Sequence, residues 1–198
     1  TGKGDTLYGG SGNSVLLGRG GDDTLTGFDG DDLIEGNGGN DTIRGNTGNG
    51  HGGHDQLHGG DGDDTIYTRT AYNQTGNSTI TGGTGNDKVF LESNNYPAVG
   101  YGNDTVDLGD GDDELTALWF DSLLGNAYAV AGQIQRFDGG PGNDIGSADF
   151  SNQSQAITFT EDTNNSFEFP DGSYYRNFEH LRYFNSGSGN DRFVFSTR

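Results

Sequence analysis

The chain of 198 residues contains no cysteine, so neither a disulfide framework nor a thiolate metal site can stabilise it. Only 28% of its residues are hydrophobic, too few for an ordinary core to offset the entropy of folding. No apolar run approaches the roughly 18 residues that a membrane span needs. Basic residues are scarce, and the net charge of -20 repels nucleic acids and anionic lipid surfaces. The acidic composition instead favours the binding of cations that are coordinated by oxygen atoms.

Glycine is abundant, with 38 residues, and it recurs in a nine-residue pattern, Gly-Gly-x-Gly-x-Asp-x-apolar-x. Repeats occupy 9–17, 18–26, 27–35, 36–44, 50–58, 59–67, 73–81, 82–90, 99–107 and 108–116, with a truncated copy at 1–8 and isolated copies at 139–147 and 186–194. Residues 45–49 and 68–72 are read as loop insertions between repeats. Because the chain opens inside a repeat, we expect a segment of a larger protein.

The spacing within each repeat has a structural meaning. Glycine permits positive φ angles, so the first six residues can form a tight turn. The last three place one apolar side chain between two outward-facing ones, as a short strand does. Two repeats then make one turn of a solenoid that rises by about 4.8 Å. The predicted interior consists of Leu7, Leu16, Leu25, Ile34, Ile43, Leu57, Ile66, Ile80, Val89, Val106 and Leu115.

The aspartate at the sixth position predicts rows of carboxylates along both edges of this solenoid. Neighbouring carboxylates would repel one another unless a cation lay between them. Calcium suits such a gap, because it accepts six to eight oxygens, including backbone carbonyls. Magnesium holds its water more strongly, and transition metals prefer nitrogen or sulfur. The alternative is a solvated acidic surface with ordinary turns, but turns alone do not explain the aliphatic residue two positions later. The fifth-position acids are predicted to face solvent: Asp22, Asp31, Asp63 and Asp112.

These repeats resemble the RTX (repeats-in-toxin, hemolysin-type calcium-binding) β-roll family. The resemblance implies an all-β fold, a right-handed parallel β-roll (β-helix solenoid) of nonapeptide repeats over 1–116. Residues 117–198 would form a divergent β-roll continuation and a β-rich C-terminal cap. In that family several calcium ions lie between loops 18 residues apart. Each ion takes carbonyls from positions two and four of one loop, carbonyls from positions one and three of the next, and both sixth-position aspartates.

Carried over residue by residue, this scheme sets Arg19, Gly21 and Asp23 against Gly36, Gly38 and Asp41, and Phe28, Gly30 and Asp32 against Gly50, Gly52 and Asp55. The other implied ligands are Asn37, Gly39, Gly59, Gly60, Asp61, Gly62, Asp64, Gly82, Gly83, Thr84, Gly85, Asp87, Gly100, Gly102, Asp104, Leu108, Asp110, Asp113, Asp144 and Asp191. Ser14 and Ser78 replace the sixth-position aspartate, so sites that depend on them are predicted to be vacant or weak.

Other candidate sites are less well supported. His51, His54 and His58 have the spacing of a zinc-binding helix, but they lie in a glycine-rich repeat where a helix is costly. Glu161 and Asp162 could be catalytic carboxylates, yet adjacent acids are more often simply exposed. The sequence has no nucleophile elbow, Walker loop or zinc-protease motif. We therefore expect no catalysis by this chain.

From Ala117 onward bulky apolar residues become frequent. Strands are predicted at Ala156–Thr160, Ser166–Phe169 and Glu179–Phe184, with a turn at Pro170–Ser173. A cap over the open end of the solenoid explains them, because that end would otherwise expose core and strand edges. The competing hypothesis is an aromatic platform for a sugar or a partner protein, made of Trp119, Tyr174, Tyr175 and Tyr183.

The resemblance implies a calcium-binding structural module of a larger secreted bacterial protein. Such a chain would leave a Gram-negative cell unfolded, through type I secretion, and fold in extracellular calcium. The alternative is an adhesive or polysaccharide-binding accessory module, as in RTX adhesins or the repeat modules of alginate epimerases. The expected partners are calcium ions, the rest of the parent polypeptide and, for the alternative, an extracellular polysaccharide.

Overall fold

The computed structural model describes residues 2–46, 53–70, 77–93, 103–117, 136–149, 158–160, 167–168, 173–185, 190 and 192–194. These residues form strands joined by turns, and no helix occurs among them. The strands are β1 (Thr6–Tyr8), β2 (Val15–Leu17), β3 (Thr24–Thr26), β4 (Leu33–Gly38), β5 (Thr42–Arg44), β6 (Gln56–Asp61), β7 (Thr65–Thr70), β8 (Thr79–Thr84), β9 (Lys88–Ser93), β10 (Thr105–Asp110), β11 (Glu114–Ala117), β12 (Arg136–Asp138), β13 (Ile145–Asp149), β14 (Thr158–Thr160), β15 (Phe167–Glu168), β16 (Tyr174–Arg176), β17 (His180–Asn185) and β18 (Arg192–Val194).

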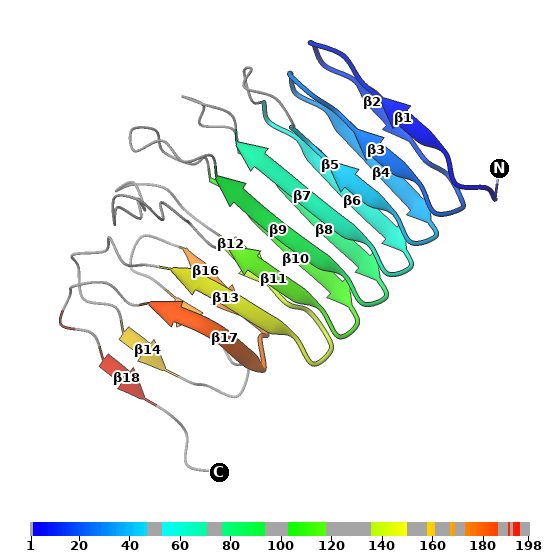
Figure 1. Ribbon diagram of the computed structural model, residues 1–198. Helices are drawn as coiled ribbons and strands as arrows, with labels where there is room; N and C mark the ends of the chain where they lie inside the picture. The colour runs from blue at the N-terminus through cyan, green and yellow to red at the C-terminus, as the bar shows by residue number, and fades with distance from the viewer. Residues whose placement is uncertain are drawn as a thin grey trace.

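The chain winds between two sheets of eight strands each (Figure 1). One has the order β1-β3-β5-β7-β9-β11-β13-β17, and the other has the order β15-β16-β12-β10-β8-β6-β4-β2. Successive strands in both sheets pair in parallel, and β15 alone among the paired strands of the described residues runs antiparallel to its neighbour. The predicted all-β parallel β-roll is therefore confirmed.

The core is a double row of aliphatic side chains between the sheets. Within the repeats each strand begins at the seventh position, and its second residue points inward, as Ile43 does between Thr42 and Arg44. All the predicted interior residues are buried except Leu7, which is only partly buried against the others. Leu108, the first residue of the repeat at 108–116, is also buried, and the core continues past that repeat through Phe137, Tyr175 and Phe178.

The two edges of the roll differ. The offset between residues that meet on adjacent turns grows along the chain, from 18 to 23, 26 and 31 residues. The extra residues always fall between an odd-numbered strand and the next even-numbered one, on what we call the insertion edge. On the other, the intact edge, the compact turns are 18–23, 36–41, 59–64, 82–87, 108–113 and 139–144. These turns line the lower right margin of Figure 1.

The C-terminal strands continue the roll and then leave it. β12, β13, β16 and β17 extend the two sheets past residue 117, so the isolated repeat at 139–147 supplies an ordinary intact turn. β18, within the repeat at 186–194, pairs instead with β14 in a separate two-stranded sheet. The predicted turn at Pro170–Ser173 lies mostly outside the described residues.

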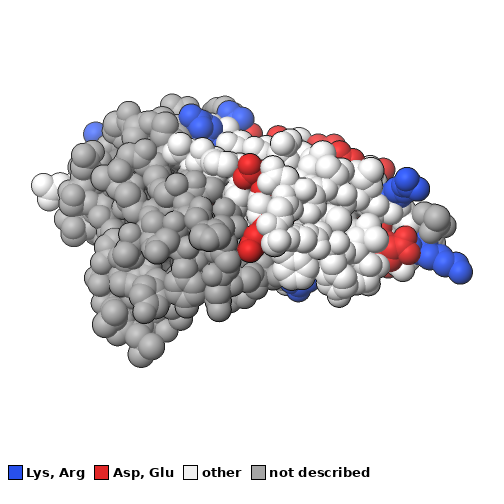
Figure 2. Space-filling model, turned by 90° about the horizontal axis from the view of Figure 1, so that it is seen from above, with Lys and Arg blue, Asp and Glu red and all other residues white. Residues whose placement is uncertain are grey.

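Charged side chains are unevenly distributed over the surface of the described residues. The face seen in Figure 2 is largely uncharged in its described part, with scattered basic side chains and with acidic ones along the upper margin, at the right end and beside the grey part. At the N-terminal end β1 and β2 are edge strands, and Tyr8 and Val15 are each 65% exposed. In the described part of the chain no helix is long and apolar enough to span a membrane.

Candidate metal sites between the turns

The sixth-position aspartates form a continuous row on the intact edge. The backbone N–H of Asp41 donates to Asp64 Oδ1 at 2.7 Å, and the N–H of Asp64 donates to Asp87 Oδ1 at 2.8 Å. The same bond joins Asp5 to Asp23, Asp23 to Asp41, Asp87 to Asp113 and Asp113 to Asp144. One carboxylate oxygen of each aspartate is thus used to hold the preceding turn in register.

The other carboxylate oxygen of these aspartates has no partner. Oδ2 is buried without a hydrogen bond in Asp23, Asp32, Asp41, Asp64, Asp87, Asp113 and Asp144. A buried carboxylate oxygen with no donor is costly, and a repeated set of them calls for a common explanation. Each could be satisfied by a proton or by a cation.

On the intact edge a backbone carbonyl from the next turn approaches the same point as Oδ2 of Asp23, Asp41, Asp64, Asp87 and Asp144. A Cβ atom added at Gly59 would lie 2.5 Å from the Gly82 carbonyl oxygen and even closer to Asp64 Oδ2. The corresponding point at Gly36 is bounded by Asp41 Oδ2 and the Gly59 carbonyl, and at Gly82 by Asp87 Oδ2 and the Leu108 carbonyl. Carboxylate and carbonyl oxygens that converge in this way are a donor set that fits calcium.

A methyl group at the first position would disrupt this convergence without removing a ligand. We expect Gly59→Ala to destabilise the calcium-loaded protein by about 1–3 kcal/mol, because its Cβ overlaps both oxygens. Gly38→Ala is the matched control, since its Cβ would meet no atom closer than the Arg19 carbonyl at 3.8 Å. Thermal unfolding in calcium measures both. Equal stability of the two variants would contradict the convergence at Gly59.

Burial makes these carboxylates hard to ionise. Burial is the main cause that raises the pKa of Asp64 and of Asp87 to about 7; neighbouring aspartates contribute to this rise, and backbone hydrogen bonds oppose it. The same cause raises the pKa of Asp144 to about 7 and of Asp113 to about 6. At neutral pH the apo row therefore holds ionised carboxylates at a cost that a bound cation would offset.

The turns adopt the backbone that the repeat predicts. Gly60 and Gly83 at the second position have φ angles of 123° and 129°. Arg19, Phe28 and Asn37 take the same left-handed conformation, with φ between 75° and 79°, although they carry side chains. Their carbonyls are thus presented by the usual turn, at a cost in backbone strain. At positions three and four, the N–H groups of Gly21, Gly39, Gly62 and Gly85 donate to the carbonyls of Gly38, Asp61, Thr84 and Asp110 on the next turn.

The insertion edge departs from the predicted ligand scheme. The carbonyl that faces Gly27 and Asp32 Oδ2 belongs to Gly45, because backbone pairing runs on from Arg44 into Gly45. Gly45 therefore takes the first position of the turn, and the inserted residues follow it, whereas the sequence analysis placed the insertion at 45–49. Asn46 is buried, and its Nδ2 donates to Asp55 Oδ2 at 2.8 Å, so this carboxylate oxygen has an amide partner. Five predicted ligands lie outside the described residues: Gly50, Gly52, Gly100, Gly102 and Asp191.

The serine substitutions also fall on the insertion edge. The N–H groups of Ser14 and Ser78 still donate to Asp32 Oδ1 and Asp104 Oδ1, at 2.8 and 2.9 Å. Neither serine supplies a carboxylate to this edge. This edge therefore has fewer converging carboxylates than the intact one.

The fifth-position side chains form a second ladder of hydrogen bonds between turns, beside the one formed by the sixth-position aspartates. The sequence analysis did not predict it. The fifth-position side chains are exposed, as predicted, but their Oδ1 atoms accept the N–H of the same position on the next turn. On the intact edge the ladder alternates in charge: Asp22, Asn40, Asp63, Asn86, Asp112 and Asn143. Because aspartate and asparagine alternate, like charges do not lie on adjacent turns. An alignment of the repeats would have revealed this alternation.

The histidines do not form a shared site in the described residues. His54 Nδ1 accepts the N–H of Asn77 at 2.9 Å, and His58 Nδ1 bonds Thr81 Oγ1 at 2.7 Å. His51, Glu161 and Asp162 lie outside the described residues. Within the described part, no three His, Cys, Asp or Glu side chains are grouped to hold a metal. Cations between the turns would need backbone carbonyls as well as carboxylates.

The competing hypothesis of an aromatic platform is wrong for Tyr175. This residue is 2% exposed and packs in the core, with its ring 4.2 Å from Phe178 and 5.8 Å from Phe137 between centroids. Side chains alternate between the two faces of β16, so Tyr175 points inward. Tyr174 lies on the outer face, beneath the Arg176 guanidinium. Trp119 and the side chain of Tyr183 are not among the described parts.

Comparison with known proteins adds one match. A family model described as the RTX calcium-binding nonapeptide repeat (4 copies) matches residues 1–27, 26–49, 46–70, 74–95 and 98–127. Searches of curated proteins and of solved structures found no match to the chain.

Proposed function

The chain belongs to the family of RTX calcium-binding nonapeptide repeats, and we propose that its intact edge binds calcium between successive turns and thereby drives folding. The observation that carries this proposal is the set of buried, unpartnered Oδ2 atoms facing backbone carbonyls. Calcium would neutralise these carboxylates and supply each with the partner that the protein does not provide.

The residues have separate tasks in this proposal. Oδ1 of each sixth-position aspartate fixes the register between turns, and Oδ2 is directed at the cation. The glycine-rich turns direct backbone carbonyls at the same cation. The carbonyls of Arg19 and Asn37 contribute in the same way as those of second-position glycines, because these residues have the same left-handed backbone. On the insertion edge Asp32 retains a comparable set with the Gly45 carbonyl, whereas Asp55 is already bonded to Asn46.

Folding and calcium are linked through the unfolded state. The core between the sheets is thin, and the chain carries 30 acidic residues, so self-repulsion opposes the compact state when calcium is absent. A ligand that binds only the folded form stabilises it by mass action. The module would stay unfolded at cytoplasmic calcium and fold after type I secretion from a Gram-negative cell, as a noncatalytic part of a larger secreted protein.

Circular dichroism of the chain during a calcium titration tests the proposal. We expect a cooperative gain of β signal with calcium, and no comparable gain with magnesium, which holds its water more strongly. A full β spectrum in a chelator at neutral pH, unchanged by calcium, would show that the aliphatic core suffices. That result would refute calcium-driven folding.

A further inference from the structure

The three-residue loop between β16 and β17, Asn177–Glu179, occupies the last place on the intact edge. The N–H of Gly139 donates to the Arg176 carbonyl, and the N–H of His180 donates to the Asp144 carbonyl, both at 3.0 Å. The first bond matches the one that Gly18 N–H donates to the Glu35 carbonyl, and the second recurs between successive intact turns, as from Thr42 N–H to the Asp23 carbonyl. Asn177 therefore corresponds to position one of a repeat and Glu179 to position six, although no repeat is present in this loop.

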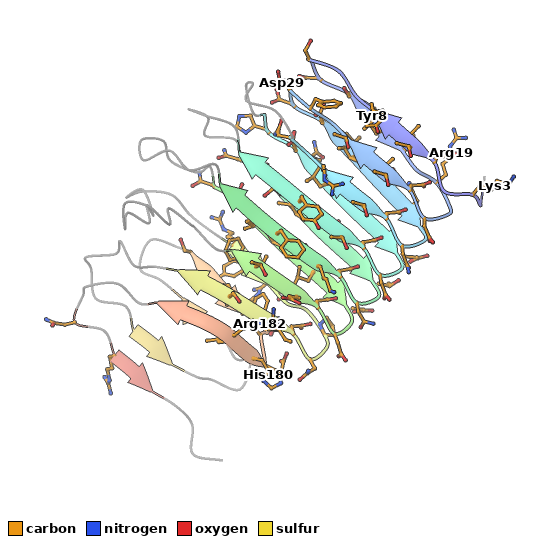
Figure 3. The ribbon with its side chains drawn as sticks, viewed as in Figure 1. Lys3, Tyr8, Arg19, Asp29, His180 and Arg182 are labelled. Carbon is orange, nitrogen blue, oxygen red and sulfur yellow. The ribbon has the colours of Figure 1, made fainter. Side chains whose placement is uncertain are left out.

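Glu179 does what a sixth-position aspartate does elsewhere. Its Oε2 accepts the N–H of Asp144 at 2.8 Å. The loop is shorter than an intact turn, and the additional methylene of glutamate lets the carboxylate reach the same hydrogen bond. Asn177 supplies the left-handed residue, with φ of 58°, and Phe178 packs into the core at 3% exposure. In Figure 3 Arg19 and His180, the residue after Glu179, mark opposite ends of this edge.

Asp144 points to a ligand at this place. The residue is fully buried at 0% exposure, and its Oδ2 has no hydrogen-bond partner. A Cβ at Gly139 would lie 2.8 Å from that oxygen, and the Asn177 carbonyl approaches the same point. This is the arrangement found between Asp64 and the Gly82 carbonyl, formed here by residues beyond the matched repeats.

We propose that Asp144, Glu179 and the Asn177 carbonyl form a terminal calcium site that fastens residues 173–185 onto the roll. The inference rests on the proposed function, since it uses the same chemistry. Only Phe178 separates positions one and six in this loop, so the third-position carbonyl of an intact turn is missing. The terminal site has one protein oxygen fewer and therefore binds calcium more weakly than the intact turns. The segment should dock last as calcium rises.

The test combines a count of bound calcium with hydrogen exchange on the full chain. In the unsubstituted protein, amides of 53–70 should become protected at lower calcium than those of 173–185. Glu179→Gln keeps an acceptor for the Asp144 N–H but loses the charge, so it should bind one ion fewer and lose calcium-dependent protection of 173–185 alone. Glu179→Asp keeps the charge but is too short to reach, and it should behave likewise. Glu35→Gln, on the outer face of β4, is the control that should change neither readout.

The outcomes separate the two proposals. If Glu179→Gln and Glu179→Asp bind as many ions as the unsubstituted chain and protect 173–185 at the same calcium concentration, the terminal site is refuted while calcium-driven folding stands. If calcium fails to protect 53–70 in the unsubstituted chain, the proposed function itself is refuted. Continued protection of 53–70 in the variants shows that the roll is folded.

Discussion

Replacement of Asp64 by asparagine should raise the calcium concentration at the midpoint of folding by about tenfold, which corresponds to about 1.4 kcal/mol for each calcium ion whose binding is coupled to folding. Asp64 lies between two turns, with Asp41 on one side and Asp87 on the other, so the substitution removes a carboxylate from two proposed sites. Asparagine Oδ1 can still accept the hydrogen bond from the Asp41 N–H, so the weaker calcium response would be due to the missing charge at Oδ2. The midpoint is measured by circular dichroism during a calcium titration.

The adjacent residue provides a closely matched control. Asp63 is exposed, and its Oδ1 accepts the N–H of Asn86, a bond that an asparagine side chain makes equally well at Asn40. Asp63→Asn removes the same charge one residue away and should shift the midpoint by less than about threefold. Equal shifts in the two variants would mean that overall charge, and not the Oδ2 position, governs folding.

The repeat predicted most of the fold because its constraint is local and recurrent. A fixed order of glycines sets the turn, and a single aliphatic residue such as Ile43 or Ile66 sets the inward face of each strand. Each repeat then has only one way to bury its apolar side chain, by stacking on its neighbours. The core and the row of aspartates followed from this reasoning, and both are present.

What the sequence did not predict lies where the repeat is broken. Gly45 and Gly50 are equally suited to position one, and only the pairing of Gly45 with Tyr67 and Phe28 decides between them. Asn46 becomes a partner of Asp55 only because the insertion lies on that edge. Glu179 was missed for a similar reason, since no glycine pattern surrounds it and its role depends on long-range register.

The acidity of the buried row predicts a second large effect, on the calcium-free protein. The folded-state pKa values of Asp64, Asp87 and Asp144, about 7, lie above the value near 3.9 expected in the unfolded chain. The folded state therefore binds protons more tightly than the unfolded state. The stabilisation from protonation is complete below about pH 4 and is lost as pH rises through about 7.

Calcium-free protein should consequently gain β signal when the pH is lowered from 8 to 5, while calcium becomes less necessary. Circular dichroism in calcium-depleted buffer measures this. A β signal that is unchanged, or that falls towards pH 5, would show that the carboxylates do not limit apo folding. This pH dependence is opposite to that of a protein whose carboxylates form salt bridges, because such a protein loses stability when the pH is lowered.

A variant whose row is permanently uncharged separates the effect of these aspartates from that of every other titratable group. In a chain with Asp41, Asp64, Asp87 and Asp113 all replaced by asparagine, Oδ1 can keep the ladder, and Nδ2 can donate to carbonyls such as that of Gly82. This variant should retain more β signal than the unsubstituted chain without calcium at pH 8, and calcium should add little. Asn46 already shows how an amide meets a carboxylate at the corresponding place on the insertion edge. If the variant needed as much calcium as the unsubstituted chain, the ions would have to be held by groups other than this row.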